Sequence, residues 1–302
     1  MGERVQKYTP MIEQYLDIKD EYKDTILFYR VGDFYEMFFD DAILASKELE
    51  IALTGKDAGV EERIPMCGVP FHAFEPYAEK LVSRGYKVGI VEQIEDPKEA
   101  KGLVRRGVIK IITPGTIDSG LNDKENNYIG SIIQIKRDYI LCYSDLTTGE
   151  GYVAKFNSFD ILANELLGLH IKEVVVDLDF ENKLLTKFIN QNQILLSRIV
   201  EKNIPDNLLH IASEIDIAYH PAIGMLINYF IKTKKQEPKY FKSFKNYVDS
   251  KYLKIDAFTK RNLEITSFGN VFVDNSSTSI SIHEMSTFNC FHYVLFSGFC
   301  GV

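Results

Sequence analysis

The sequence predicts an α/β protein of two domains with an atypical C-terminal tail. The chain has 302 residues, enough for about two domains of ordinary size. Its 45% hydrophobic and 26% charged residues are typical of globular proteins, which excludes a disordered or coiled-coil chain. Apolar runs of strand length alternate with segments of helical spacing, and a polar stretch at residues 119–127 divides them into two groups.

The first group, residues 1–118, predicts a mixed α/β domain. Thr9 and Pro10 are typical of a helix start, and apolar residues at helical spacing follow them. Asp40-Asp41 can cap a second helix that is expected to run to about Leu49, and a third helix is expected from Phe74 to Arg84. Strands are expected at residues 26–31, 34–39, 86–93 and 108–113. The turn signal Gly32-Asp33 joins the first two strands as a hairpin.

The second group, residues 128–248, opens with strand-like runs. These runs cover residues 128–135, 139–144 and 151–156. Ser158 can cap a helix to about Gly168, and a buried strand is expected at residues 171–178. Helical segments are expected to about residue 236, and the last of them carries Ile223, Leu226, Ile227 and Phe230 on one face. A β-β-β-α-β order followed by helices predicts a ribonuclease-H-like layout.

Residues 265–302 differ in kind from the rest of the chain. They contain two charged residues, Asp274 and Glu284, and no Lys or Arg follows Arg261. The stretch is rich in Ser, Phe and Cys and has neither helical nor strand periodicity. A buried β segment is one interpretation. We favour a change of reading frame near Glu264, which would produce such a shift in composition.

The sequence shows no membrane or export signal. No apolar run approaches the length of a membrane helix, and no apolar segment of signal-peptide type follows Met1. The four cysteines have no C-x-x-C or Cys/His spacing. We therefore expect reduced thiols, a cytoplasmic protein and no bound metal.

The net charge of −8 argues against generic coating of nucleic acid, which requires a basic protein. One local basic cluster stands out, opposed only by Glu99. It consists of Lys98, Lys101, Arg105, Arg106 and Lys110. On charge alone we favour a solvated loop over a phosphate-binding site.

The segment Phe34-Tyr35-Glu36 is the most informative motif. In a strand that begins after a tight turn, the period of two puts Phe34 and Glu36 on one face. A flat apolar wedge and a hydrogen-bonding carboxyl group would then project together. The alternative is a core strand with Phe34 buried and Glu36 solvated.

Residues 32–38 resemble the mismatch-reading Phe-x-Glu motif of the MutS family of DNA mismatch repair proteins. Further blocks resemble the family in the same order. They are residues 9–15, 64–73, 91–97, 112–116 and 253–264. The resemblance implies a mismatch-recognition domain (1–118), a linker (119–127), a connector domain (128–248) and the start of the core lever domain (249–264). The remaining residues, 265–302, form the atypical tail.

The resemblance also implies roles and partners. Phe34 would insert from the minor groove of double-stranded DNA and stack on a mispaired or unpaired base, and Glu36 would hydrogen-bond that base. The five basic residues become candidates for contacts to the DNA backbone. The connector would dock a MutL-type repair partner. The family acts as a dimer, whereas we expect this chain to be a monomer in the cytoplasm, associated with the nucleoid.

The similarity ends after Glu264. Full-length members continue to an ATPase domain with a Gly-x-x-x-x-Gly-Lys-Ser/Thr phosphate loop, which binds ATP and Mg²⁺. No such run occurs in this sequence, and Gly55-Lys56 lacks both the upstream glycine and the following hydroxyl residue. We therefore expect no cofactor and no enzymatic activity in this chain.

Two other functions are open. Asp145, Asp177 and Asp179 sit at the ends of expected strands, where carboxylates of a ribonuclease-H-like nuclease could bind two Mg²⁺ ions. We favour turn and capping roles for them, because aspartate is common there and the family's connector is not catalytic. The other possibility is an interaction module that docks the MutL-type partner without binding DNA.

Overall fold

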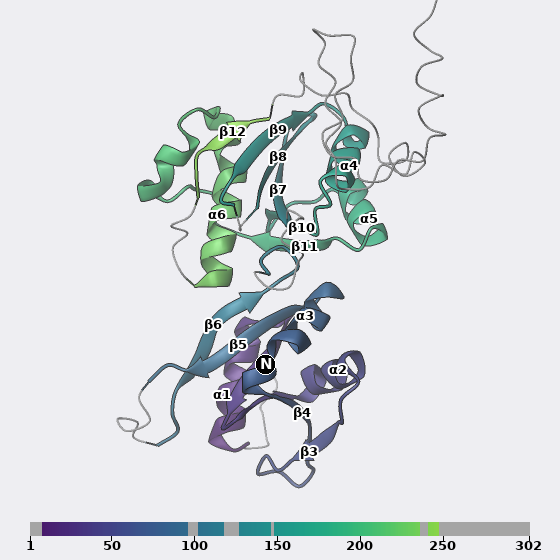
Figure 1. Cartoon of the computed structure of the whole chain (residues 1–302), viewed down its shortest axis with the longest axis vertical. Coiled ribbons are helices and arrows are strands. Elements are labelled where there is room, and N and C mark those ends of the chain that lie inside the picture. Colours follow the sequence, from purple (N-terminus) through teal and green to yellow (C-terminus); the bar gives the residue numbers. More distant parts are fainter. Residues whose placement is uncertain (1–7, 96–101, 118–126, 146–147, 236–240, 248–302) are drawn as a thin grey trace, which may run out of the picture. The chain divides into compact units, whose positions relative to one another are not determined.

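The structure is a computed structural model that describes residues 8–95, 102–117, 127–145, 148–235 and 241–247 (Figure 1). Within these residues the chain forms two six-stranded sheets with helices packed on them, which confirms the predicted α/β class. The described residues exclude positions 119–126 of the expected linker (119–127), the expected lever segment 249–264 and the tail 265–302. None of the described helices is long and apolar enough to cross a membrane.

The first sheet has the order β3-β4-β2-β1-β5-β6. Only β1 and β5 are parallel to each other, and the other neighbours are antiparallel. The strands are β1 (Thr25–Val31), β2 (Phe34–Phe38), β3 (Thr54–Lys56), β4 (Ile64–Pro70), β5 (Lys87–Gln93) and β6 (Arg106–Ile112). The helices are α1 (Pro10–Glu21), α2 (Phe39–Leu49), the 3₁₀ turn η1 (Phe71–Ala73) and α3 (Glu75–Ser83).

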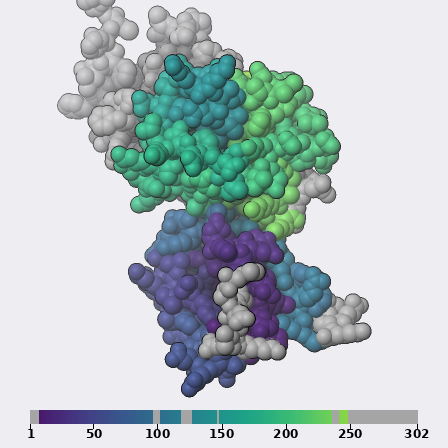
Figure 2. All heavy atoms as spheres, turned by 180° about the vertical axis from the view of Figure 1, so that it is seen from behind, coloured from purple at the N-terminus to yellow at the C-terminus, as the bar shows by residue number. Residues whose placement is uncertain are grey.

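The alternation of side chains along β1 and β2 builds a core on each face of this sheet. Phe28, Tyr35 and Met37 belong to the core formed with α2 and α3. Tyr29 and Phe38 point to the opposite face and pack with α1. Figure 2, the view from behind, shows atoms of the α1 region in purple at the surface of this part of the chain. Full burial of each such side chain contributes roughly 1.5–3 kcal/mol, so the two cores hold β2 rigidly.

Asp41 does not cap α2 as the sequence suggested. The helix begins at Phe39, whose φ of +52° turns the chain directly from β2 into α2. The Asp41 carboxylate is buried and accepts hydrogen bonds from the Tyr15 hydroxyl, 2.8 Å away, and the Leu27 amide, 3.0 Å away. Lys19 Nζ lies 2.7 Å from the same carboxylate. Asp41 therefore joins α1, β1 and α2.

Strands β3 and β4 were not predicted. Gly55 lies in β3, and Pro65, Gly68 and Pro70 lie in β4, so both strands lack the β-branched and aromatic pattern that identifies a strand in sequence. Strand β3 pairs with β4, and β4 pairs in turn with the distant strand β2, from Phe34 opposite Pro70 to Phe38 opposite Met66. Partner choice of this kind cannot be inferred from local periodicity.

The second sheet has the order β11-β10-β7-β8-β9-β12. Its strands are β7 (Tyr128–Ile135), β8 (Asp138–Asp145), β9 (Gly151–Phe156), β10 (Glu173–Asp177), β11 (Leu195–Ile199) and β12 (Phe244–Asn246). Strands β7, β8 and β9 are antiparallel neighbours, and β10 and β11 run parallel to β7. This is the predicted ribonuclease-H-like layout, except that β11 lies where the sequence predicts helix.

Helices cover both faces of the second sheet (Figure 1). The longer elements are α4 (Phe159–Gly168), α5 (Lys183–Gln191) and α6 (His220–Lys234), and the 3₁₀ segments are η2 (Asp206–Ala212) and η3 (Ile217–Tyr219). Ser158 caps α4 as predicted, since its side chain accepts a hydrogen bond from the Ile161 amide. The apolar face predicted for α6 is confirmed: Ile223, Leu226, Ile227 and Phe230 are fully buried.

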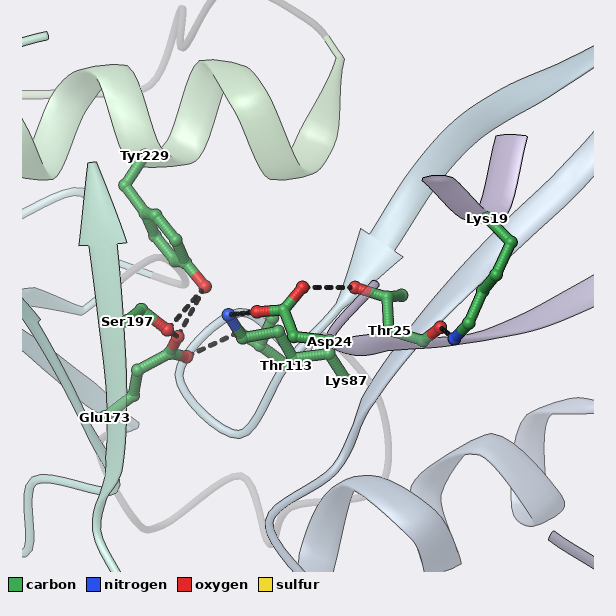
Figure 3. A network of polar contacts seen from close by, with 8 residues as sticks. All are labelled: Lys19, Asp24, Thr25, Lys87, Thr113, Glu173, Ser197 and Tyr229. Carbon is green, nitrogen blue, oxygen red and sulfur yellow. Dashed lines mark hydrogen bonds and ion pairs between the residues drawn. The ribbon is translucent and has the colours of Figure 1, made fainter. Parts of the chain in front are cut away.

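A buried carboxylate, that of Glu173, lies at the start of β10 and binds several neighbouring segments (Figure 3). Glu173 has no exposed surface and accepts hydrogen bonds from Ser197 Oγ at 2.6 Å and the Tyr229 hydroxyl at 2.5 Å. It also accepts hydrogen bonds from Thr113 Oγ1 at 2.5 Å and the Gly115 amide at 3.0 Å. Burial, with the Glu173 charge beside it, raises the pKa of the Tyr229 hydroxyl, which therefore stays protonated as a donor. The segment after β6 is thus fixed to the second sheet.

Candidate nucleic-acid interface

The candidate site begins at the tight turn between β1 and β2. Val31 pairs directly with Phe34, so the loop consists only of Gly32 and Asp33. Gly32 has φ +56°, a left-handed conformation that glycine adopts without steric cost. The Phe71 amide donates a hydrogen bond to the Asp33 carbonyl at 2.9 Å, which ties the turn to the end of β4.

Phe34 is 48% exposed, although its neighbours Tyr35 and Met37 are buried. The register puts Phe34, Glu36 and Phe38 on one face of β2, as the sequence predicted. Phe38 is covered by the α1 core, whereas the Phe34 end of the strand is open. The alternative with Phe34 buried in a core strand is therefore wrong. Phe34 thus presents an exposed aromatic ring on a strand whose other residues are buried or half-buried.

Glu36 is not solvated but pairs with Lys56 at the end of β3. The two side chains are 15% and 23% exposed. Lys56 Nζ also lies 5.5 Å from the centroid of the Phe38 ring. Gly68 is opposite Glu36 in the sheet, and a Cβ at this position would lie 3.2 Å from the Tyr35 carbonyl oxygen and 3.7 Å from Glu36 Cγ. Gly68 thus leaves space beside the Glu36 side chain.

Arg30 braces the turn from the opposite face of the sheet. Its Nε donates a hydrogen bond to the Gly32 carbonyl at 2.5 Å, and its guanidinium carbon lies 3.5 Å from the Phe71 ring centroid. The guanidinium also pairs with Glu92 at 3.3 Å. Glu92 in turn accepts a hydrogen bond from the Tyr35 hydroxyl at 2.5 Å. Burial and the Glu92 carboxylate raise the pKa of Tyr35, which keeps this donor protonated.

The basic cluster is only partly present at this end of the sheet. Arg106 lies opposite Gln93, where β5 and β6 reach the edge that carries the turn. Its guanidinium donates to the Arg30 carbonyl at 2.9 Å and the Val104 carbonyl at 3.1 Å, so it supports the turn internally. Arg105 is exposed, and Lys110 is half-buried further along β6. Lys98 and Lys101 lie outside the described residues.

Sequence reasoning identified Phe34 and Glu36 but missed Lys56 and the roles of Arg30 and Glu92. Lys56 drew attention only as part of an incomplete phosphate loop. Arg30 lies only four residues before Phe34, yet its contacts reach Phe71 and Glu92, which are distant in sequence. No local signal connects these residues, because strand pairing brings them together.

The geometry does not support the nuclease alternative. Asp145 lies opposite Tyr128 at the start of β7, whereas Asp177 is at the far end of β10, four residues beyond the Glu173–Ile129 pair. The two carboxylates are therefore separated by five residues along the sheet, roughly 16 Å, which is too far to share a pair of metal ions. Asp177 pairs with Lys202. Over the described ranges, no group of three or more His, Cys, Asp or Glu residues could hold a metal ion.

Comparison with known proteins gives a family match for the residues of each sheet. Residues 9–120 match the family model of MutS domain I, and residues 127–242 match that of MutS domain II. The chain is 46% identical over 263 residues to the DNA mismatch repair protein MutS of Geobacillus sp. (strain WCH70), which covers 86% of this chain and 31% of that protein. It is 44% identical over 265 residues to the same-named proteins of Bacillus thuringiensis (strain Al Hakam) and Bacillus cereus (strain B4264), covering 86% of this chain and 30% of each relative. The chain thus spans about a third of the length of these relatives.

Proposed function

Since the chain belongs to the MutS family of DNA mismatch repair proteins, we propose that its first domain reads mispaired bases in double-stranded DNA with Phe34 and Glu36. The observation that carries the proposal is the exposure of Phe34 at 48% on a strand with a packed core on each face. A ring held in this way can enter a base stack without first being ordered, so less binding energy is lost on association.

Stacking explains why a wedge would prefer mismatches of any sequence. Insertion of an apolar side chain from the minor groove unstacks a base step and kinks the duplex by about 20–90°. Unstacking costs a few kcal/mol and is cheapest where pairing is already poor. Stacking of a base on an aromatic ring recovers roughly 1–3 kcal/mol whatever the base. The net gain is therefore largest at a mispaired or unpaired base.

Glu36 would add discrimination against paired DNA. A carboxylate can accept a hydrogen bond from a base imino group, or donate one when protonated. In a normal duplex that group is already paired, and the carboxylate faces phosphate charge without compensation. The same residue thus favours the mismatch and penalises the homoduplex.

The test measures binding of this chain to a homoduplex, a G·T duplex and a duplex with one unpaired thymine, by fluorescence anisotropy. Phe34→Ala should remove the preference for the two defective duplexes, a loss of about tenfold for a stacking contribution near 1.4 kcal/mol. Glu36→Ala should reduce discrimination more than affinity. Ile43→Ala is the matched control, because Ile43 is 49% exposed on α2, which packs on the opposite face. Retained preference in Phe34→Ala would refute the wedge.

A second proposal concerns the second domain as a docking site for a MutL-type partner. Leu178 and Val200 are 53% and 61% exposed, and the Leu178 amide donates to the Ile199 carbonyl at 3.0 Å, so the two apolar side chains are neighbours. Changing both to Asp should abolish binding of a purified MutL-type protein measured by surface plasmon resonance. The Phe34→Ala variant should bind the MutL-type protein normally. Leu209→Asp is the surface control, because Leu209 is 47% exposed on η2. Unchanged binding of the double variant would exclude this surface.

A further inference from the structure

We propose that Lys56 is a positioning residue for Glu36 that sets how strongly the site discriminates mismatched from paired DNA. This inference rests on the proposed function, because it assigns a further specificity-determining residue to the same site. The contact that carries it is the ion pair between Lys56 Nζ and Glu36 Oε2, which joins β3 to β2 across β4.

The surroundings hold this pair in one arrangement. Both side chains are largely shielded from solvent, at 23% exposure for Lys56 and 15% for Glu36. The Lys56 ammonium is also 5.5 Å from the Phe38 ring centroid, within the range of a cation–π attraction. Phe38 is fully buried and cannot move easily. Lys56 therefore has two fixed partners, unlike a lysine on an open surface.

Lys56 and Glu36 meet across β4, the strand that lies between β3 and β2. Gly68 is the β4 residue opposite Glu36, and a Cβ there would be 3.2 Å from the Tyr35 carbonyl oxygen. It would also lie 3.7 Å from Glu36 Cγ, so glycine leaves room beside the Glu36 side chain. The glycine, the lysine and the carboxylate thus form one arrangement, although they lie on three strands.

The ion pair makes the two carboxylate oxygens of Glu36 different from each other. Oε2 is bound by Lys56, while Oε1 makes no hydrogen bond to any other described residue. Anchoring through Oε2 would restrict the Glu36 rotamers and leave Oε1 for a base. Glu36 can then approach the groove in a defined orientation.

A direct role of Lys56 on a DNA phosphate would give a different result. A lysine that neutralises a phosphate contributes about 0.9 to the slope of log affinity against log salt, and it does so on every duplex. A lysine that acts only through Glu36 leaves this slope unchanged and alters the ratio of affinities. The two mechanisms are therefore separable by experiment.

The experiment is a double-mutant cycle on the whole chain. Affinities for the homoduplex and the G·T duplex are measured by anisotropy over a range of salt for wild type, Lys56→Met, Glu36→Gln and the double variant. We expect Lys56→Met to lower the affinity ratio by about three- to tenfold, a coupling typical of residues in contact. The double variant should match Glu36→Gln alone. Lys56→Arg, which keeps the charge, should restore much of the ratio.

Two controls define what would overturn the inference. Lys80→Met removes a lysine that pairs with Glu50 at 3.6 Å on the opposite side of the domain, and it should leave the ratio unchanged. Urea unfolding of each variant checks that the fold is retained. An unchanged ratio in Lys56→Met, additive effects in the double variant, or a salt slope reduced by about 0.9 would each overturn the positioning role.

Failure of the inference is distinguishable from failure of the proposed function. If wild type shows no mismatch preference, or if Phe34→Ala keeps it, the proposed function fails and this inference fails with it. If wild type prefers the mismatch, Phe34→Ala does not, and Lys56→Met behaves as wild type, only the role of Lys56 is wrong.

Discussion

The guanidinium of Arg30 lies 3.5 Å from the centroid of the Phe71 ring, on the face of the sheet opposite Phe34. Together with the hydrogen bond from Arg30 to the Gly32 carbonyl, this contact stabilises the turn from the face opposite Phe34. The exposed ring on one face thus depends on an aromatic–cation contact on the other.

Arg30→Ala should loosen this turn. We expect a loss of about 1–3 kcal/mol in the free energy of unfolding, from one hydrogen bond of a charged donor and one shielded cation–π contact. Mismatch preference should fall with it, because a mobile Phe34 must be ordered on binding. Urea unfolding and anisotropy measure the two effects. Arg137→Ala, at an exposed arginine of the β7–β8 turn, should change neither.

Glu173→Ala should destabilise the protein strongly. The substitution leaves the hydroxyls of Thr113, Ser197 and Tyr229 without their buried acceptor. One unsatisfied buried donor costs about 1–3 kcal/mol, so we expect a loss of at least about 3 kcal/mol in urea unfolding. Glu181→Ala, at an exposed carboxylate, is the control. A loss under about 1 kcal/mol would show that water replaces the carboxylate.

The free energy of unfolding should fall as the pH rises from about 9 to 12. Burial, with Asp41 nearby, raises the pKa of the Cys67 thiol to about 12, and burial raises the pKa of Tyr29 to about 12. In this window the unfolded chain releases protons that the folded chain retains, so alkali favours unfolding. Below pH 9 these groups contribute their full stability. Urea unfolding at several pH values measures the slope, which should be shallower in Cys67→Ala.

Gly224→Ala tests the close approach of α6 to the segment before η2. A Cβ at residue 224 would lie 1.9 Å from the Lys202 carbonyl oxygen, so the backbone would have to move. Helix propensity alone predicts the opposite, a gain of about 1 kcal/mol for Ala over Gly. We expect a loss of stability in urea unfolding. A more stable variant would mean that this contact is easily relieved.

Much of the fold follows from local sequence patterns. Period two along residues 34–38 predicted the shared face of Phe34 and Glu36, and helical spacing predicted the buried face of α6. The cap at Ser158 could also be predicted, because a serine directly before an apolar helical run commonly caps that helix. These features depend on residues within a few positions of each other.

The remainder depends on contacts between distant segments. Strands β3 and β4 carry glycine and proline where strands usually carry β-branched residues. Strand β4 is stabilised by pairing with β2, and β3 by pairing with β4. Strand β11 was mistaken for helix because a short apolar run has no period of its own. Lys56 and Glu173 acquire their roles only when several strands meet, which no local pattern encodes.

Strand β2 is joined to its neighbours without spare residues. Only two residues separate it from β1, and α2 begins at Phe39, directly after it. Insertion or deletion of one residue here would invert the side chains that follow and bury Phe34 while exposing Tyr35. Evolution can therefore vary this strand by exchanging residues but not by changing its length. Among relatives, gaps in alignment should fall on either side of residues 31–39 and not within them.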